Sequence, residues 1–161
     1  MNLTALSGRS LAQRLVVEPV WIGKQLNLEG DVVDIGSGNG SPAIPWGCCS
    51  ALNSIQMVES RLRRVVFLRH LIAVLEIPGA SVHRGRFEDV AAAVGTPDWV
   101  TLQGVALTEG LLKTIRCIQK RETRLVWITA AGTTKPRGLK YSTFRTPITG
   151  SEILISSMDQ S

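Results

Sequence analysis

Residues 31–40, with the sequence DVVDIGSGNG, join a short apolar strand to closely spaced glycines, and no other segment constrains the fold as strongly. Val32, Val33 and Ile35 are β-branched and favour a strand buried in a parallel sheet. Glycine suits the turn after such a strand, where the backbone bends tightly or must approach a ligand closely. Open α/β sheets bind ligands at the carboxyl ends of their strands. The sequence therefore predicts a ligand site directly after residue 35.

The spacing of the glycines distinguishes between cofactors. The glycines of this loop are Gly36, Gly38 and Gly40. The dinucleotide fingerprint G-x-G-x-x-G would require a further glycine at position 41, which is Ser41. A nicotinamide or flavin cofactor is therefore disfavoured, and the loop indicates the cofactor loop of an S-adenosylmethionine (SAM) methyltransferase.

Two carboxylates support this interpretation. Glu59 ends the apolar segment 55–58, where an α/β cofactor site places an acidic residue that accepts hydrogen bonds from both ribose hydroxyls. Asp34 lies at the end of the first strand, and we expect both acids to be positioning groups. The alternative is a glycine-rich turn without a ligand, flanked by two solvated acids.

Size and composition limit the class of protein. A chain of 161 residues, 44% of them hydrophobic, can bury one core, which predicts a single domain over 1–161, with an N-terminal helical segment (1–29) and an α/β core (30–161). No apolar run approaches the ~20 residues of a membrane span, so we expect a cytoplasmic protein. The three cysteines and two histidines lack zinc-site spacing, and we expect reduced, mostly buried cysteines and no metal. A net charge of +5 favours an anionic partner, nucleic acid first.

Strand-like and helix-like segments alternate, which predicts a mostly parallel α/β sheet that ends in an antiparallel hairpin. The segment 8–28 is weakly helical, with a break near Pro19. A short helix is expected after Pro42, with Ser41 as its cap. The expected strands are 31–35, 54–58, 80–83, 98–102, 124–129 and 152–156, with a further short strand within 130–145. The other expected helices are 60–76, 87–94 and 108–120.

Three blocks resemble one known family. Residues 36–45, GSGNGSPAIP, are similar to the G-x-G-x-G-x-P-G-I-P motif of the bacterial small-subunit (16S) rRNA guanine-N7 methyltransferases, also called glucose-inhibited division protein B. Residues 59–69, ESRLRRVVFLR, and 85–89, GRFED, resemble two further blocks of that family, and Asn2-Leu3-Thr4 resembles its N-L-T element. The match is strongest from 31 to 89, and we expect a member that is divergent and short at its amino end.

The resemblance implies a Rossmann-like, SAM-dependent methyltransferase fold, and SAM as the cofactor. The chain also departs from the family pattern at three points where relatives contact cofactor or RNA. The family's H-x-x-D-S element is replaced near 16–19, its Arg-Ala pair is Gln103-Gly104 here, and its Lys-Gly pair is Ala130-Ala131. Together with the loop, the resemblance gives the expected cofactor-binding residues: Asp34, Gly36, Gly38, Gly40, Ser41, Glu59, Ser60, Phe87, Glu88 and Gln103.

Methyl transfer to guanine N7 is expected to need alignment rather than a general base, because N7 carries a lone pair and no proton. No catalytic residue is therefore assigned. Small-subunit rRNA or a ribosomal particle is the expected partner, with no membrane partner. The expected RNA-binding cations are Arg64, Lys135, Arg137 and Lys140. The alternatives are a small-molecule methyltransferase and a catalytically silent SAM-binding module.

Overall fold

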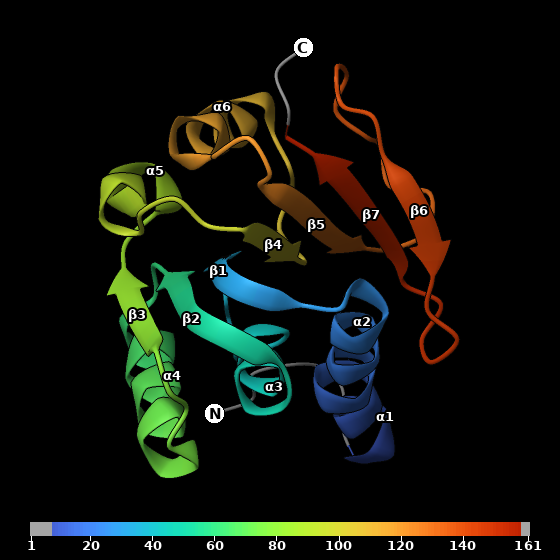
Figure 1. Cartoon of the computed structure of the whole chain (residues 1–161). Helices are drawn as coiled ribbons and strands as arrows, with labels where there is room; N and C mark the ends of the chain where they lie inside the picture. Colours follow the sequence, from blue (N-terminus) through green and yellow to red (C-terminus); the bar gives the residue numbers. More distant parts are fainter. Residues whose placement is uncertain (1–7, 159–161) are drawn as a thin grey trace.

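A seven-stranded sheet forms the centre of the protein, in a computed structural model that describes residues 8–158 (Figure 1). The strand order is β3-β2-β1-β4-β5-β7-β6. The strands are β1 (Glu29–Ile35), β2 (Ala51–Glu59), β3 (Ala80–Arg84), β4 (Trp99–Gln103), β5 (Arg124–Thr129), β6 (Ser142–Arg145) and β7 (Glu152–Ser157). The first five are parallel, and β7 pairs antiparallel with both β5 and β6. The predicted α/β class, with its antiparallel C-terminal hairpin, is confirmed.

Helices cover both faces of this sheet (Figure 1). One face carries α2 (Glu18–Leu26), α3 (Ala43–Cys49) and α4 (Leu62–Leu75), which pack through Ile22, Trp46 and Leu68. The other carries α5 (Phe87–Val90), the 3-10 helix η2 (Ala91–Ala93) and α6 (Glu109–Ile118), which pack through Phe87 and Ile115. The connections that follow β1 and β2 cross one face of the sheet, and those that follow β3 and β4 cross the other face. The strand order therefore changes direction at β1, which lies between β2 and β4. Such a switch point is where open α/β sheets bind ligands.

The observed elements differ from the expected ones mainly at their ends. β5 has the expected bounds, and β1 and β2 begin two and three residues earlier than predicted, at Glu29 and Ala51. The helix expected over 87–94 divides into α5 and η2. Trp46, Trp99 and Trp127 are buried in the core, while Trp21 is half-buried with its ring edge-on to Phe144.

Residues 8–26 are helical without a break at Pro19, which corrects the expectation. They comprise α1 (Gly8–Ala12), the π-helix η1 (Gln13–Val17) and α2. Pro19 lies in the first turn of α2, where a proline needs no intrahelical N–H partner. The hydrogen-bond pattern widens to a π turn directly before it, as often occurs beside functional sites.

A buried carboxylate fixes this N-terminal segment to the C-terminal hairpin. Glu18 is fully buried, and it accepts hydrogen bonds from the hydroxyls of Thr146, Thr149 and Ser151 in the turn between β6 and β7. A buried carboxylate without such donors would destabilise the fold. The contact holds η1 at the carboxyl edge of the sheet.

Two expectations about side chains are wrong. Cys48, Cys49 and Cys117 are free thiols, but all three are exposed, because they lie on the outer faces of α3 and α6. Ser41 does not cap α3. Pro42 holds the cap position without a side-chain hydrogen bond, and the Ser41 hydroxyl donates to Gln103 Oε1 instead.

Among residues 8–158, no helix combines the length and apolar character needed to cross a bilayer. Within the same residues, no group of three or more His, Cys, Asp or Glu side chains is arranged to hold a metal ion.

Candidate functional site

A cleft of about 570 Å³ opens at the carboxyl ends of β1, β2 and β4, where the sequence predicts a ligand. The turn after β1, the start of α4, the end of β4 and the π-helix η1 form its walls. Its lining residues are Arg14, Leu15, Gly36, Ser37, Gly38, Asn39, Ser41, Glu59, Ser60, Arg61, Arg64, Gln103, Gly104 and Val105.

Glu59 connects the first two loops of this cleft. Its Oε2 accepts a hydrogen bond from the Gly38 backbone N–H at 3.0 Å, and its Oε1 accepts one from the Arg61 N–H at 2.8 Å. The Arg64 guanidinium forms an ion pair with Oε2 at 3.6 Å. The Glu59 side chain is only 5% exposed, so these donors hold its carboxylate in a single orientation at the mouth of the cleft.

The glycine turn is also tied directly to β2. The N–H groups of Gly36 and Ser37 both donate to the Val58 carbonyl, at 2.9 and 3.0 Å. This places the turn beside the end of β2 and brings Gly38 to Glu59.

Each of the three loop glycines meets a different steric demand. All have positive φ, which side chains rarely adopt. A Cβ on Gly36 would lie 2.6 Å from Val105 Cγ2, and one on Gly40 would lie 2.6 Å from Ile44 Cγ1. A Cβ on Gly38 would meet nothing closer than 3.6 Å, because this residue faces the open cleft. Gly38 is therefore the loop glycine whose backbone is open to the cleft, whereas Gly40 packs the loop against α3.

Asp34 lies beneath the glycine turn and does not line the cleft. Its carboxyl group is buried, and Oδ2 has no hydrogen-bond partner. The pKa of Asp34 is raised to about 7, chiefly because the carboxyl group is buried; a hydrogen bond with Ser37 opposes this rise, and the negative charge of Glu59 adds to it. A cation in the cleft would favour the ionised form of this group.

Ser41 and Gln103 meet across the cleft floor. The Ser41 hydroxyl donates to Gln103 Oε1 at 3.0 Å. Since that oxygen is engaged, the Gln103 amide nitrogen remains available as a neutral donor. The following residue, Gly104, has φ +66° and no atom within 4 Å of a Cβ position, so the backbone here is open to the cleft.

A smaller hollow of about 230 Å³ adjoins the cleft. It shares Gly36, Glu59 and Ser60 with the cleft and adds Phe87 and Glu88. Phe87 is 3% exposed and presents its ring from the hydrophobic core, whereas Glu88 is exposed. The two hollows together form a continuous surface from Gln103 to Glu88.

The structure brings most of the expected cofactor residues together. Eight of them line the two hollows: Gly36, Gly38, Ser41, Glu59, Ser60, Phe87, Glu88 and Gln103. Asp34 and Gly40 lie behind the loop. Of the expected RNA-binding residues, Arg64 lines the cleft. Lys135, Arg137 and Lys140 lie in the exposed connection after β5, and Lys135 pairs with Glu152 at 3.2 Å.

The expected site residues did not include seven of the lining residues: Arg14, Leu15, Ser37, Asn39, Arg61, Gly104 and Val105. Arg14 and Leu15 precede the glycine loop by about twenty positions and belong to a helix with no motif of its own. Gly104 carried a usable signal, because a glycine directly after a buried strand suggests close backbone approach. The N-L-T element at 2–4 lies outside the described residues.

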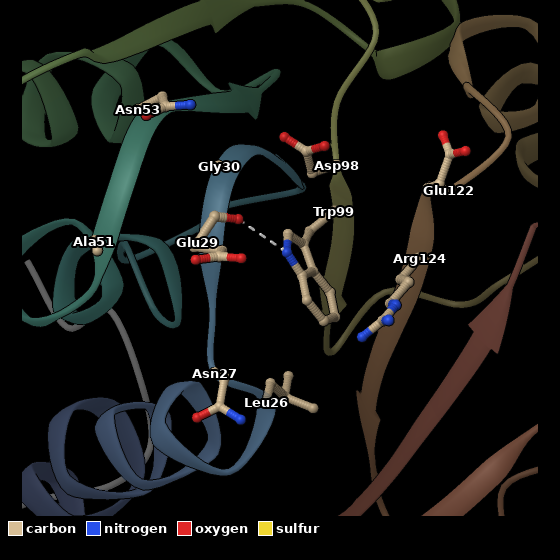
Figure 2. A pocket seen from close by; sticks show the side chains of 10 residues that line it. All are labelled: Leu26, Asn27, Glu29, Gly30, Ala51, Asn53, Asp98, Trp99, Glu122 and Arg124. Carbon is tan, nitrogen blue, oxygen red and sulfur yellow. Dashed lines mark hydrogen bonds between the residues drawn. The ribbon is translucent and has the colours of Figure 1, made fainter.

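A third hollow, of about 630 Å³, lies at the opposite, amino edge of the sheet (Figure 2). There the Arg124 guanidinium lies 5.2 Å from the ring centroid of Trp99, whose Nε1 donates to the Glu29 carbonyl. Asp98 accepts from the Asp31 N–H and pairs with Lys120. These groups serve the sheet itself, and the hollow lies away from the glycine loop after β1 and from the switch point at the carboxyl edge.

The strand order and the glycine turn joined to an acid at the end of β2 define a Rossmann-like domain of the methyltransferase type. A crystal structure of an MtNAS mutant in complex with S-adenosylmethionine has this fold, with a TM-score of 0.71 and 17% identity, over 88% of this chain and 63% of that chain. The likeness shows the fold alone.

The chain belongs to the family described as GidB, rRNA small subunit methyltransferase G, whose model matches residues 1–136. It is 36% identical over 110 residues to the ribosomal RNA small subunit methyltransferase G of Bartonella quintana, which covers 61% of this chain and 51% of that protein. The enzyme of the same name from Mycobacterium ulcerans is 35% identical over 120 residues, covering 73% of this chain and 70% of that protein. The chain thus spans about half the length of the Bartonella relative.

Proposed function

We propose that this protein is a SAM-dependent methyltransferase that transfers a methyl group to a guanine N7 in small-subunit rRNA. Membership of the family supports the rRNA substrate. The observation that carries the proposal is the junction of Gly38 and Glu59, which places an open backbone turn and an oriented carboxylate on the same side of one cleft.

The residues present fit SAM. The Glu59 carboxylate is positioned for ribose hydroxyls, and the open backbone at Gly38 leaves room for a close ligand. Phe87 and Glu88 in the adjoining hollow would contact the adenine. The unpartnered, buried Oδ2 of Asp34 lies beneath the cleft, where its negative charge would favour the cationic sulfonium.

SAM supplies the methyl group on a positively charged sulfur. The N7 lone pair would accept this methyl group directly, so no proton would have to leave N7. The residues of the cleft therefore need only bind, orient and exclude water. The described lining of the cleft contains no His or Cys side chain, and the proposed transfer needs no general base.

The acceptor guanine must be unstacked or in a loop, because the major groove of A-form RNA is too deep and narrow for N7 to be reached. Arg64, Lys135, Arg137 and Lys140 would contact RNA phosphates, with the late connection reaching the RNA from the end of β5. Residues 1–161 would act as one domain in the cytoplasm, where ribosomal particles are found.

Two measurements test this function. Calorimetric titrations with SAM and, separately, with NAD should show binding of SAM alone. Incubation with labelled SAM and small-subunit rRNA, free or as a ribosomal particle, should transfer label to RNA. Binding of SAM without transfer to either form of RNA would contradict the rRNA substrate and leave a small-molecule methyltransferase or a silent binding module.

A further inference from the structure

Three arginines converge on the mouth of the cleft. Arg14 comes from the π-helix η1, and Arg61 and Arg64 come from the start of α4. Glu59 is the one carboxylate among the described residues that line this cleft. The mouth therefore has three guanidinium groups against a single acid.

The cofactor does not account for this charge. SAM carries a sulfonium and an ammonium against one carboxylate, so its net charge is positive, and three cations at its site would disfavour it. Arg14 and Arg61 are exposed, and within residues 8–158 neither side chain forms an ion pair. Free guanidinium groups gathered at one mouth suit an anion with several oxygens, above all a phosphate.

Arg64 differs from the other two because its charge is already engaged. Its Nη1 lies 3.6 Å from Glu59 Oε2 and 3.6 Å from the position that a Cβ on Gly38 would occupy. The guanidinium thus lies over the glycine turn, beside one of the two oxygens that ribose hydroxyls would use. A ribose bound to Glu59 would compete with this ion pair.

We infer that Arg14, Arg61 and Arg64 form a phosphate site for the RNA backbone next to the acceptor nucleotide, and that Arg64 exchanges Glu59 for this phosphate when SAM binds. This inference rests on the proposed function and adds the place where the RNA enters. It also couples the two ligands: SAM releases Arg64 for the RNA, and RNA removes Arg64 from Glu59. Each ligand must then raise the affinity for the other by the same factor.

The late connection cannot replace this site. Lys135 already pairs with Glu152, and neither Arg137 nor Lys140 lines the cleft. Those cations can add affinity for RNA at a distance from the reacting base. The three arginines, in contrast, surround the opening through which the base must pass.

The first test measures the salt dependence of RNA binding. Affinity for a full-length small-subunit rRNA transcript is determined in a series of KCl concentrations for the wild type and for Arg14→Gln/Arg61→Gln. Loss of two phosphate contacts should lower the slope of log affinity against log salt by about 1.4 and weaken binding about tenfold near 0.1 M KCl. The matched control is Lys113→Gln/Arg116→Gln, which removes two exposed cations from α6 on the other face of the sheet. An equal change in both variants, or none in the first, overturns the site.

The second test measures coupling. SAM affinity is determined with and without the same RNA, and RNA should raise it several-fold in the wild type. Arg64→Gln should bind SAM more tightly than the wild type without RNA, and RNA should no longer raise its affinity. A wild type without coupling, or an Arg64→Gln variant that keeps it, overturns the exchange. A wild type that binds no SAM would instead refute the proposed function, so the two failures are distinguishable.

Discussion

The Gly38 backbone N–H donates a hydrogen bond of 3.0 Å to Glu59 Oε2, across a separation of 21 residues. The bond joins the turn after β1 to the end of β2, and it orients the carboxylate before any ligand arrives. A loop fixed in this way loses little conformational entropy when a ligand binds. Ligand binding should therefore be sensitive to changes at either residue.

Gly38→Val is expected to abolish SAM binding and leave the fold largely intact. The new side chain would enter the open cleft, and its φ of +56° is unfavourable for a β-branched residue. Calorimetry measures the binding, and circular dichroism checks the fold. Gly95→Val is a matched control, because Gly95 also has positive φ and free space but lies outside the cleft. A folded Gly38→Val protein that binds SAM like the wild type would show that this loop does not contact the cofactor.

Glu59→Ala is expected to weaken SAM binding by roughly 1–3 kcal/mol, the range for hydrogen bonds to a charged group. The substitution also removes the carboxylate that accepts hydrogen bonds from the Gly38 and Arg61 N–H groups, and this loosening of the loop adds to the loss of affinity. Glu59→Gln retains an acceptor oxygen and should lose less affinity. Unchanged calorimetric affinity in both variants would remove Glu59 from the ribose site.

The stability of the protein should depend on Asp34 between about pH 4 and 7. Burial raises the pKa of its carboxyl group from 3.8 to about 7, so the folded state keeps a proton that the unfolded state releases. This group's contribution is fully present below pH 4 and is lost as pH rises through about 7, by roughly 4 kcal/mol at most. Urea unfolding from pH 4 to 8 should show the decline in the wild type and a flatter profile in Asp34→Asn. Equal profiles would show that Asp34 titrates normally.

The cations of the late connection provide a prediction separate from the arginines at the cleft mouth. Replacing Lys135, Arg137 and Lys140 together with glutamine should lower RNA affinity and reduce the salt slope by about 2, since each single-stranded phosphate contact contributes about 0.7. SAM affinity should not change, because none of the three lines the cleft. An RNA affinity and slope equal to those of the wild type would leave the connection as a solvated loop.

The parts of the structure that were predictable are those that depend on local sequence. The β-branched run at 32–35 is sufficient for a buried strand, and the spacing of the three glycines is sufficient for the turn that follows it. Glu59 was found for the same reason, because it directly ends an apolar segment. These signals come from residues within one strand and its loop, where the spacing of apolar residues and the turn residues determine the local structure.

The parts that were not predictable depend on distant contacts. Glu18 is buried because three hydroxyls more than 120 positions away donate to it, and no local pattern reveals such a partner. Arg14 lines the cleft from a helical segment that is held by this contact and by the packing of α2 on α3, and both involve residues distant in sequence. The exposure of Cys48 and Cys49 depends on which side of a short helix faces the core, and seven residues are too few for a clear period.

The final prediction concerns Gln103, where the family resemblance implies an arginine. Glutamine offers a neutral amide, and its Oε1 is engaged by the Ser41 hydroxyl, so it exerts no long-range attraction on a phosphate or carboxylate. Gln103→Arg would add a fixed cation at the end of β4, at the expense of the hydrogen bond from Ser41. We expect the added cation to attract RNA phosphates and to raise methyl transfer to rRNA, with no gain in affinity for SAM, whose net charge is positive.

Gln103→Met is the matched control, because it has a similar length and also loses the acceptor for Ser41 without adding charge. It should bind and transfer no better than the wild type. Calorimetry with SAM and label transfer to rRNA measure both quantities. If the folded Gln103→Arg protein matches the wild type in both, the charge at this position has no role, and Gln103 serves to pack the end of β4 against Ser41.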